Sequence, residues 1–231
     1  MTDTPPPTTL TPPMKPWGVG AIETGDGRDV WEISDAEVQR DLSAAARALD
    51  ELGVRGGDRV LFCSMLAESG QFWPFVVGAM LAGAQLSCAD ATEGEAVRVA
   101  MFARLVQYRA VLGVTGAILD GLDALGHSYA DTFGMIDIVG ARPSAYARLE
   151  DAGLSPHHFV VCGPAIAIGL GPGTPARADG DEWQLDVDAT DGRVLVTNLR
   201  PRATEFVRRP TATYGAPVYG GIVPEFRGRQ L

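Results

Sequence analysis

Apolar residues recur every three or four positions in the segment that follows Ser34, and then give way to short continuous apolar runs. Ser34 and Glu37 have the spacing of a capping box, in which each side chain binds a free backbone amide at the start of a helix. The pattern therefore predicts a helix over residues 35–52 that ends at Gly53. Its apolar face consists of Val38, Leu42, Ala45, Leu49 and Leu52. The run 59–64 is apolar throughout its centre, which is typical of a strand in a parallel sheet covered on both faces.

Strands continue to alternate with helices as far as Cys162. After the first strand, the predicted strands are 85–89, 110–114, 136–139 and 159–162. Four more helices are predicted after the first one. The first of these ends at Ala82. The other three run from Glu93 to Tyr108, from a Thr115 cap to a point before Gly126, and from Pro143 to Asp151. Such alternation predicts an α/β fold, with a mostly parallel sheet flanked by helices and right-handed connections.

Two of these helices have a predicted placement. The helix that ends at Ala82 has Pro74 in its first turn, where a missing N–H costs little, and it is apolar on almost all sides. It should therefore be deeply buried. In the helix that begins at Glu93, the predicted apolar stripe is Val97, Met101, Leu105 and Tyr108.

The two ends of the chain depart from this alternation. Residues 1–16 are rich in proline and threonine, which predicts a disordered tail. Residues 17–33 fit a hairpin with its turn at Gly25-Asp26-Gly27. The loop 169–175 separates the α/β part from a small antiparallel β subdomain expected over 180–215. Its predicted strands are 183–187, 194–196 and 204–208. We therefore divide the chain into a tail (1–16), an α/β domain (17–165), and a β-rich subdomain with a C-terminal tail (166–231).

Composition narrows the class of protein. The chain has 29 acidic and 19 basic residues, a formal net charge of −10, so general affinity for nucleic acid or an anionic membrane is not expected. No stretch approaches the roughly 20 apolar residues of a membrane helix, and no secretory signal is present, so a cytoplasmic location is expected. Cys63, Cys88 and Cys162 each lie in an apolar run and are expected to be reduced core residues rather than reactive thiols. The three histidines provide little material for a metal site, and none is expected.

Several segments resemble, in their order along the chain, the adenylate-forming superfamily of acyl-CoA synthetases and their relatives. In the first half these are 31–34 (WEIS), 52–60 (LGVRGGDRV) and 75–84 (FVVGAMLAGA). In the second half, 141–146 with 152–156, 160–164, 192–199 and 206–213 resemble the phenylacetate-CoA ligase branch. The resemblance implies the fold of a ligase that uses ATP and CoA on an acyl or aryl acid. By the same resemblance, the expected ligand-binding residues are Gly163, Pro164, Arg208, Thr211 and Thr213, and CoA or AMP/ATP are the cofactors to consider.

Four departures from that family concern its chemistry. Where a flexible phosphate-binding loop is needed, the chain has Thr115 and Gly116 leading directly into a helix. The segment after Cys162 lacks the family's tyrosine and magnesium-binding glutamate, and Thr213 replaces the aspartate that holds the ribose. These 231 residues are also expected to lack the family's mobile C-terminal domain with its catalytic lysine, since their only lysine is Lys15. We therefore predict no catalytic residues, and this polypeptide alone is not expected to make acyl-adenylates.

Four other groups of residues are candidate binding or catalytic sites. The arginines at 200, 202, 208 and 209 suit either an anion such as a CoA phosphate or the solvent face of strands, and the second interpretation is favoured. Loop 169–174 resembles a phosphate loop but lacks the following Lys-Ser/Thr, so a hinge is preferred. His157 and His158 are expected at the surface. The acidic residues Asp179, Asp181, Glu182, Asp186, Asp188 and Asp191 match no calcium loop and are expected on a solvated hairpin.

Three functional hypotheses remain open. The first is a shortened, catalytically degenerate acyl-CoA synthetase relative that keeps a small-molecule pocket, or serves a partner. Its pocket would lie near Gly163 and Pro164, at the carboxyl ends of the parallel strands. The second is a structural protein that forms a homodimer through the apolar run 72–81. The third is an acyl- or aryl-CoA ligase-type enzyme that works with a partner subunit.

Overall fold

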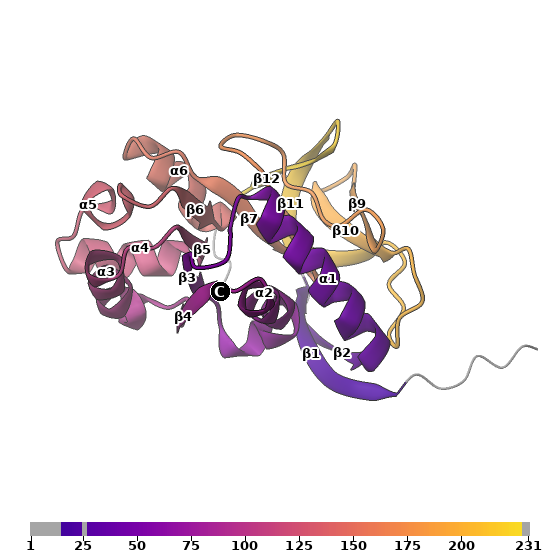
Figure 1. Cartoon of the computed structure of the whole chain (residues 1–231). Coiled ribbons are helices and arrows are strands. Elements are labelled where there is room, and N and C mark those ends of the chain that lie inside the picture. The colour runs from indigo at the N-terminus through magenta and orange to yellow at the C-terminus, as the bar shows by residue number, and fades with distance from the viewer. Residues whose placement is uncertain (1–14, 25–26, 228–231) are drawn as a thin grey trace, which may run out of the picture.

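Six strands form the central sheet, in the order β4-β3-β5-β6-β7-β8 (Figure 1). The computed structural model describes residues 15–24 and 27–227. In chain order the strands are β3 Arg59–Cys63, β4 Gln85–Ala89, β5 Ala110–Val114, β6 Ile138–Ala141, β7 His157–Cys162 and β8 Ala165–Ile168. Neighbouring strands are parallel except for β7 and β8, which form an antiparallel pair. The predicted α/β fold with a mostly parallel sheet is confirmed.

Helices cover both faces of this sheet. On one face, α1 (Asp35–Glu51) and α2 (Ser69–Leu81) share a buried cluster with Val60 and Phe62 of β3. On the other face, Leu61 and Cys63 join a cluster with four helices. These are α3 Ala96–Leu105, α4 Gly116–Ala124, α5 Tyr129–Phe133 and α6 Pro143–Asp151. Short 3₁₀ turns at Leu66–Glu68 and Glu93–Glu95 precede α2 and α3.

The start of α1 forms as its sequence predicts. The Ser34 side chain accepts a hydrogen bond from the Glu37 amide, and the Glu37 carboxylate accepts one from the Ser34 amide. At the other end Gly53 has φ of +88°, a conformation that costs glycine least. The preceding hairpin pairs β1 (Pro16–Thr24) with β2 (Gly27–Ser34). Residues 25–26 of its turn and residues 1–14 of the predicted tail (1–16) lie outside the described residues, while Pro16 belongs to β1.

A separate antiparallel sheet lies near the C-terminus, with the order β12-β11-β10-β9. Its strands are β9 Trp183–Val187, β10 Arg193–Asn198, β11 Arg209–Val218 and β12 Gly221–Glu225. The predicted third strand at 204–208 was wrong, because the backbone and side chain of Asn198 bind Phe206 and close a loop there. The four-stranded sheet packs on β7 and β8 through a shared cluster of Val160, Cys162, Ala167, Ala176, Val194 and Ile222. Figure 1 shows α1 running between this sheet and α2.

The strands predicted from the sequence end at Cys162, so β8 was not predicted. Gly163 has φ of +62° and reverses the chain, so the apolar run after it pairs with β7. The strand predicted at 136–139 lies two residues later. Cys63 and Cys162 are buried as expected, but Cys88 is exposed because β4 is an edge strand.

The two helix placements were also wrong. Pro74 is the sixth residue of α2 rather than part of its first turn, because the helix already begins at Ser69. Only one side of α2 is buried, and Trp73, Met80 and Leu81 are exposed. Of the predicted stripe, Val97, Met101 and Leu105 of α3 face outward, whereas Tyr108, which lies beyond the end of the helix, is buried. The small residues of α3 turn inward because α4 approaches closely, and a side chain at Gly121 would lie 2.5 Å from Ala96.

Candidate functional site

The carboxyl ends of the parallel strands enclose only a narrow cleft. Gly163 is one of the residues that line it. The cleft has a volume of about 90 Å³, and the ion pair of Arg142 with Glu68, at 2.7 Å, lines it. This volume is well below the range of about 300–1,000 Å³ typical of small-molecule sites. Its size does not suit a nucleotide.

Thr211 and Thr213 lie on β11 beside this cleft and are buried. A side chain at Gly163 would lie 3.3 Å from Thr211, so the structure brings these three expected ligand-binding residues together. Thr211 Oγ1 donates to the Val194 carbonyl at 2.9 Å, and Thr213 Oγ1 donates to the Val161 carbonyl at 2.6 Å. The two hydroxyls therefore tie β11 to its neighbours.

The segment where the sequence resemblance would place a phosphate loop forms the start of α4. Thr115 is the N-cap, and its hydroxyl accepts from the Ile118 amide and donates to the Ala91 carbonyl. The Gly116 amide donates to Ser144 Oγ at 2.9 Å. These polar groups are engaged within the protein, so they are not available to hold phosphates.

Loop 169–175 is likewise closed by its own contacts. The Gly171 amide donates to Thr174 Oγ1 at 2.9 Å, and the Gly173 amide donates to the Tyr146 hydroxyl at 3.1 Å. Two of the glycine amides that a phosphate loop would offer are thus already satisfied.

His157 and His158 pack against this loop and against Tyr146. The expectation that they lie at the surface was wrong. The two side chains are buried. His157 Nδ1 lies 3.0 Å from the Gly169 carbonyl, and the His158 ring stacks on Tyr146 with centroids 3.9 Å apart. Burial lowers the pKa of both imidazoles, that of His158 to about 4, with the neighbouring His157 adding to the effect.

Each of the four arginines at 200, 202, 208 and 209, a candidate anion site, has an acidic partner. Arg208, which has φ of +47°, pairs with Asp186 at 3.0 Å, and Arg209 pairs with Asp29. These two pairs lie at the surface, as the solvent-face interpretation predicts. The structure places Arg208 outside the narrow cleft lined by Gly163 and Thr213.

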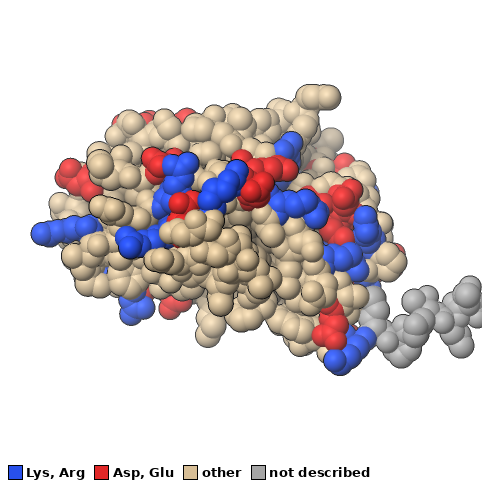
Figure 2. All heavy atoms as spheres, in the orientation of Figure 1, with Lys and Arg blue, Asp and Glu red and all other residues tan. Residues whose placement is uncertain are grey.

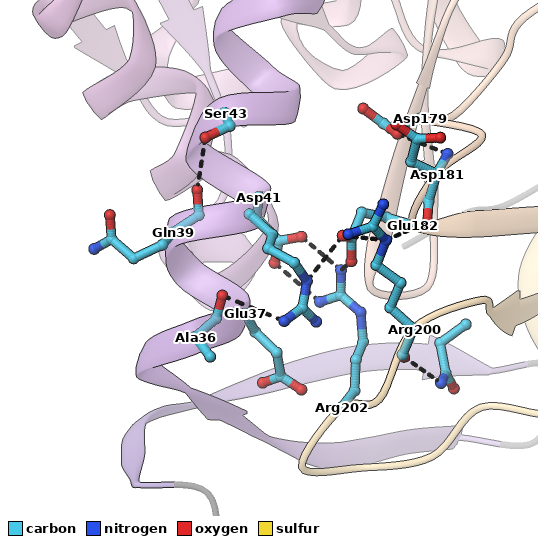
Figure 3. Close-up of polar contacts among 12 residues, drawn as sticks. Ala36, Glu37, Gln39, Asp41, Ser43, Asp179, Asp181, Glu182, Arg200 and Arg202 are labelled. Carbon is cyan, nitrogen blue, oxygen red and sulfur yellow. Dashed lines mark hydrogen bonds and ion pairs between the residues drawn. The ribbon is translucent and has the colours of Figure 1, made fainter.

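Arg202 and Glu182 contradict that interpretation, because both are buried. Arg202 donates to both carboxylate oxygens of Asp41, at 2.6 and 3.0 Å, and to Glu182 at 2.8 Å (Figure 3). Its guanidinium lies 3.9 Å from the Trp183 ring centroid. Burial favours loss of its proton, but the hydrogen bond and charge of Asp41 and the charges of nearby glutamates outweigh this, and the pKa of Arg202 is raised. The network joins α1 to the start of β9.

A much larger cavity lies on the other side of the Gly163–Pro164 turn. Its volume is about 550 Å³, within the range of about 300–1,000 Å³ typical of small-molecule sites. It lies between α1, α2, β8 and the segment 177–183, and Pro164 lines it. Its apolar wall includes Ala45, Pro74, Phe75, Ile166, Ile168 and Trp183. Pro164 is one of the ligand-binding residues expected from the resemblance, but the cavity was not predicted, because its walls come from segments more than a hundred residues apart.

Ion pairs across the rim of this cavity connect α1 with the segment that leads to β9. Arg47 pairs with Asp179, and Arg177 pairs with Glu51 at 2.9 Å. Figure 2 shows paired blue and red side chains as a band across this face of the molecule. Within the described residues, no group of three or more His, Cys, Asp or Glu side chains is placed to hold a metal ion. No helix in the described part of the chain is long and apolar enough to cross a membrane.

Comparison with solved structures shows a shared fold with acyl-CoA ligases. The chain superposes on 2-hydroxyisobutyryl-CoA ligase, in complex with 2-HIB-AMP and CoA, with a TM-score of 0.65 and 14% identity, over 87% of this chain and 52% of that one. It matches the Klebsiella oxytoca NpsA N-terminal subdomain with a TM-score of 0.60 and 12% identity, over 92% and 62%. For the anthranilate CoA ligase AuaEII the TM-score is 0.60 and the identity 13%, over 88% and 45%.

The comparison with solved structures confirms the predicted fold, but this likeness does not extend to the sequence. No protein-family model matches the sequence, and no curated protein matches it. The chain therefore has the fold of the adenylate-forming superfamily, and it spans about half the length of the ligases it matches.

Proposed function

We propose that this chain binds a small molecule in the 550 Å³ cavity between α1, α2 and β8 and does not adenylate carboxylates by itself. The observation that carries the proposal is the cavity: it is large enough for a drug-sized ligand and combines an apolar wall with a charged rim. The solved ligases that share the fold bind acyl-adenylates, and 2-hydroxyisobutyryl-CoA ligase also binds CoA. A retained acyl, CoA or nucleotide-like pocket is therefore the first ligand class to test here.

Three features support the absence of adenylation. The cleft beside Gly163 is too small for AMP or ATP. The hydroxyl and amides that open α4 are bound within the protein, and Thr213 donates its hydroxyl to a strand carbonyl where a ribose-binding carboxylate would be needed. Loss of such preorganised groups costs a transfer reaction several kcal/mol each, on the order of 3 kcal/mol for one donor.

A thermal-shift screen of acyl-CoAs, AMP, aryl acids and neutral aryl alcohols tests the pocket. We expect at least one compound to raise the melting temperature of the wild type but not of Ala44→Trp, which fills the cavity from α1. Ser43→Trp is the matched control, since Ser43 is the exposed neighbour on the same helix. A screen with no shift at millimolar ligand, or a shift that persists in Ala44→Trp, would exclude this cavity. Pyrophosphate release from ATP, CoA and a carboxylate would contradict the second half of the proposal.

A second candidate function is homodimer formation through the β4 edge. No strand pairs with the outer side of β4 in the described part of the chain, and β4 follows the exposed Met80 and Leu81 of α2. The exposed Leu105 of α3 lies beside it, across a shallow hollow that β4 also lines. In Figure 2 the surface around α2 shows few charged side chains, so two copies would not repel each other there. A symmetric pair would join two β4 edges and bury these side chains.

Light scattering across a wide concentration range tests this candidate. We expect a dimer for the wild type and a monomer for Leu81→Lys. Val207→Lys, at an exposed apolar residue of the C-terminal region, is the control and should leave the mass unchanged. A monomeric wild type at every concentration would remove the candidate.

A further inference from the structure

The charges that line the 550 Å³ cavity are unequal, and this bears on which ligand it takes. Four acidic residues line it, Asp41, Glu51, Asp179 and Asp181, against two basic residues, Arg47 and Arg177. The excess of acid would repel a carboxylate or a phosphate and attract a cation. The inference developed here rests on the proposed function, since it names the ligand class of the same cavity.

Both arginines in the lining are already engaged. Arg47 pairs with Asp179, and Arg177 pairs with Glu51 at 2.9 Å. An anionic ligand would have to displace one of these carboxylates to gain an arginine, and the displaced carboxylate would remain beside it. An anion could therefore bind an arginine of this cavity only by breaking an existing ion pair.

Asp181 is the acidic residue in the lining that lacks such a pair. Asp41 is held by Arg202, and Asp179 and Glu51 are held by the rim arginines. The Asp181 backbone forms hydrogen bonds, but its carboxylate has no hydrogen-bond or ion-pair partner among residues 15–24 and 27–227. Asp181 is an exposed residue in the cavity lining, so its negative charge is available to a ligand there. Figure 3 shows Asp181 beside Glu182.

A second acceptor without a donor lies deeper. Gln71 of α2 lines the cavity and is only 4% exposed. Its Nε2 donates to the carbonyls of Ala21 and Gly163, at 3.0 and 3.1 Å, which fixes the orientation of the amide. Its Oε1 is buried and accepts no hydrogen bond within the described residues. Buried acceptors are rarely left unpaired, and Gln71 lines both hollows, so an N–H donor in either hollow would satisfy Oε1.

The remaining wall is apolar and partly aromatic. Phe75, Ile166 and Trp183 line it. One face of the Trp183 ring is already covered by the Arg202 guanidinium. This wall suits the hydrocarbon part of a ligand whose polar end meets the acceptors.

We propose that the cavity binds an organic cation, an amine joined to an apolar or aromatic body, in preference to a carboxylate or a phosphate. Asp181 supplies the opposing charge, and Gln71 Oε1 supplies a buried hydrogen-bond acceptor. The preference is opposite in charge to the acyl-adenylates bound by the ligases that share the fold.

Calorimetric titration of the full chain with three ligands of matched shape tests the preference: 3-phenylpropylamine, 3-phenylpropan-1-ol and 3-phenylpropanoate. We expect the amine to bind at least about tenfold more tightly than the carboxylate, with the neutral alcohol between them. Asp181→Asn should weaken the amine about three- to tenfold and leave the alcohol unchanged. Asp90→Asn makes the same charge change at an exposed residue outside the cavity lining and should change neither.

Each outcome has a separate meaning. If the carboxylate binds as tightly as the amine, or Asp181→Asn leaves the amine unaffected, the cation preference is overturned while the cavity stands as a binding site. If none of the three ligands binds, the preference is overturned as well. The screen with Ala44→Trp then decides the proposed function independently, because it includes larger ligands that are anionic or neutral.

Discussion

The two hollows on either side of the Gly163–Pro164 turn differ in size and in origin. The cleft of about 90 Å³ lies at the carboxyl ends of the parallel strands, where open α/β sheets usually bind ligands. The cavity of about 550 Å³ depends instead on α1 meeting β8 and the approach to β9. In this chain the common ligand position is narrow and lined by paired side chains. The open space arises where the two parts of the fold meet, which shows that the fold does not by itself place the site.

The largest effect is expected from breaking the Arg202 network that joins α1 to the start of β9. Arg202→Ala would leave Asp41 and Glu182 without their buried partner, and we expect a loss of about 3–5 kcal/mol in the free energy of unfolding. Arg208→Ala breaks an exposed pair instead and should cost about 1 kcal/mol or less. Urea denaturation measures both. Equal losses would show that burial of the network contributes little.

The side chain that lines both hollows provides the next test. Gln71→Leu leaves the carbonyls of Ala21 and Gly163 without a donor, and we expect a loss of about 2 kcal/mol. Gln39→Leu, at an exposed position of α1, is the control and should stay within about 0.5 kcal/mol of the wild type. The same denaturation series compares them, and a neutral Gln71→Leu would contradict the role of its amide as a link between the hairpin and the Gly163 turn.

A pH series tests the loop that supplies Leu170 to the larger cavity. The folded protein lowers the pKa of His158 to about 4, below its usual value of 6.5, so the unfolded chain takes up this proton first. The contribution of His158 to stability is therefore fully present above about pH 6.5 and is lost as the pH falls toward 4. We expect the wild type to lose on the order of 2 kcal/mol more than His158→Phe over that window. Parallel pH profiles of the two proteins would be the contrary result.

The smallest effect is expected in the cleft itself. A double-mutant cycle on Glu68 and Arg142 should give a coupling energy of about 1 kcal/mol, since the pair is only partly buried. The double variant Glu68→Ala/Arg142→Ala enlarges the cleft, yet we expect no thermal shift with AMP, because it restores none of the phosphate-binding groups. A clear shift with AMP would mean that side-chain filling alone separates the cleft from a nucleotide site.

The sequence predicted what local interactions determine. The capping box of Ser34 and Glu37, the Thr115 cap and the glycine turn at Gly53 depend on neighbours a few residues away, and all three form as expected. The parallel strands could be found for a similar reason, because burial on both faces makes their residues continuously apolar.

The errors lie where a distant partner decides. The large residues of α3 point outward because Gly121 of α4 lets the small ones pack, and periodicity alone cannot tell the two sides apart. Arg202 is a charged residue in a loop, and its burial is explained by Glu182 and by Asp41, which is 161 residues away. The larger cavity was missed for the same reason.

Glu37 shows how such distances affect the order of folding. One oxygen of its carboxylate accepts from Ser34 three residues before it, and the other accepts from Ala203, 166 residues later. The first contact can form while α1 is still an isolated helix, but the second must wait until nearly the whole chain has been made and folded. Until then one oxygen of the cap remains in water. A single carboxylate thus takes part in both an early and a late step of folding, and the late step brings together the walls of the cavity.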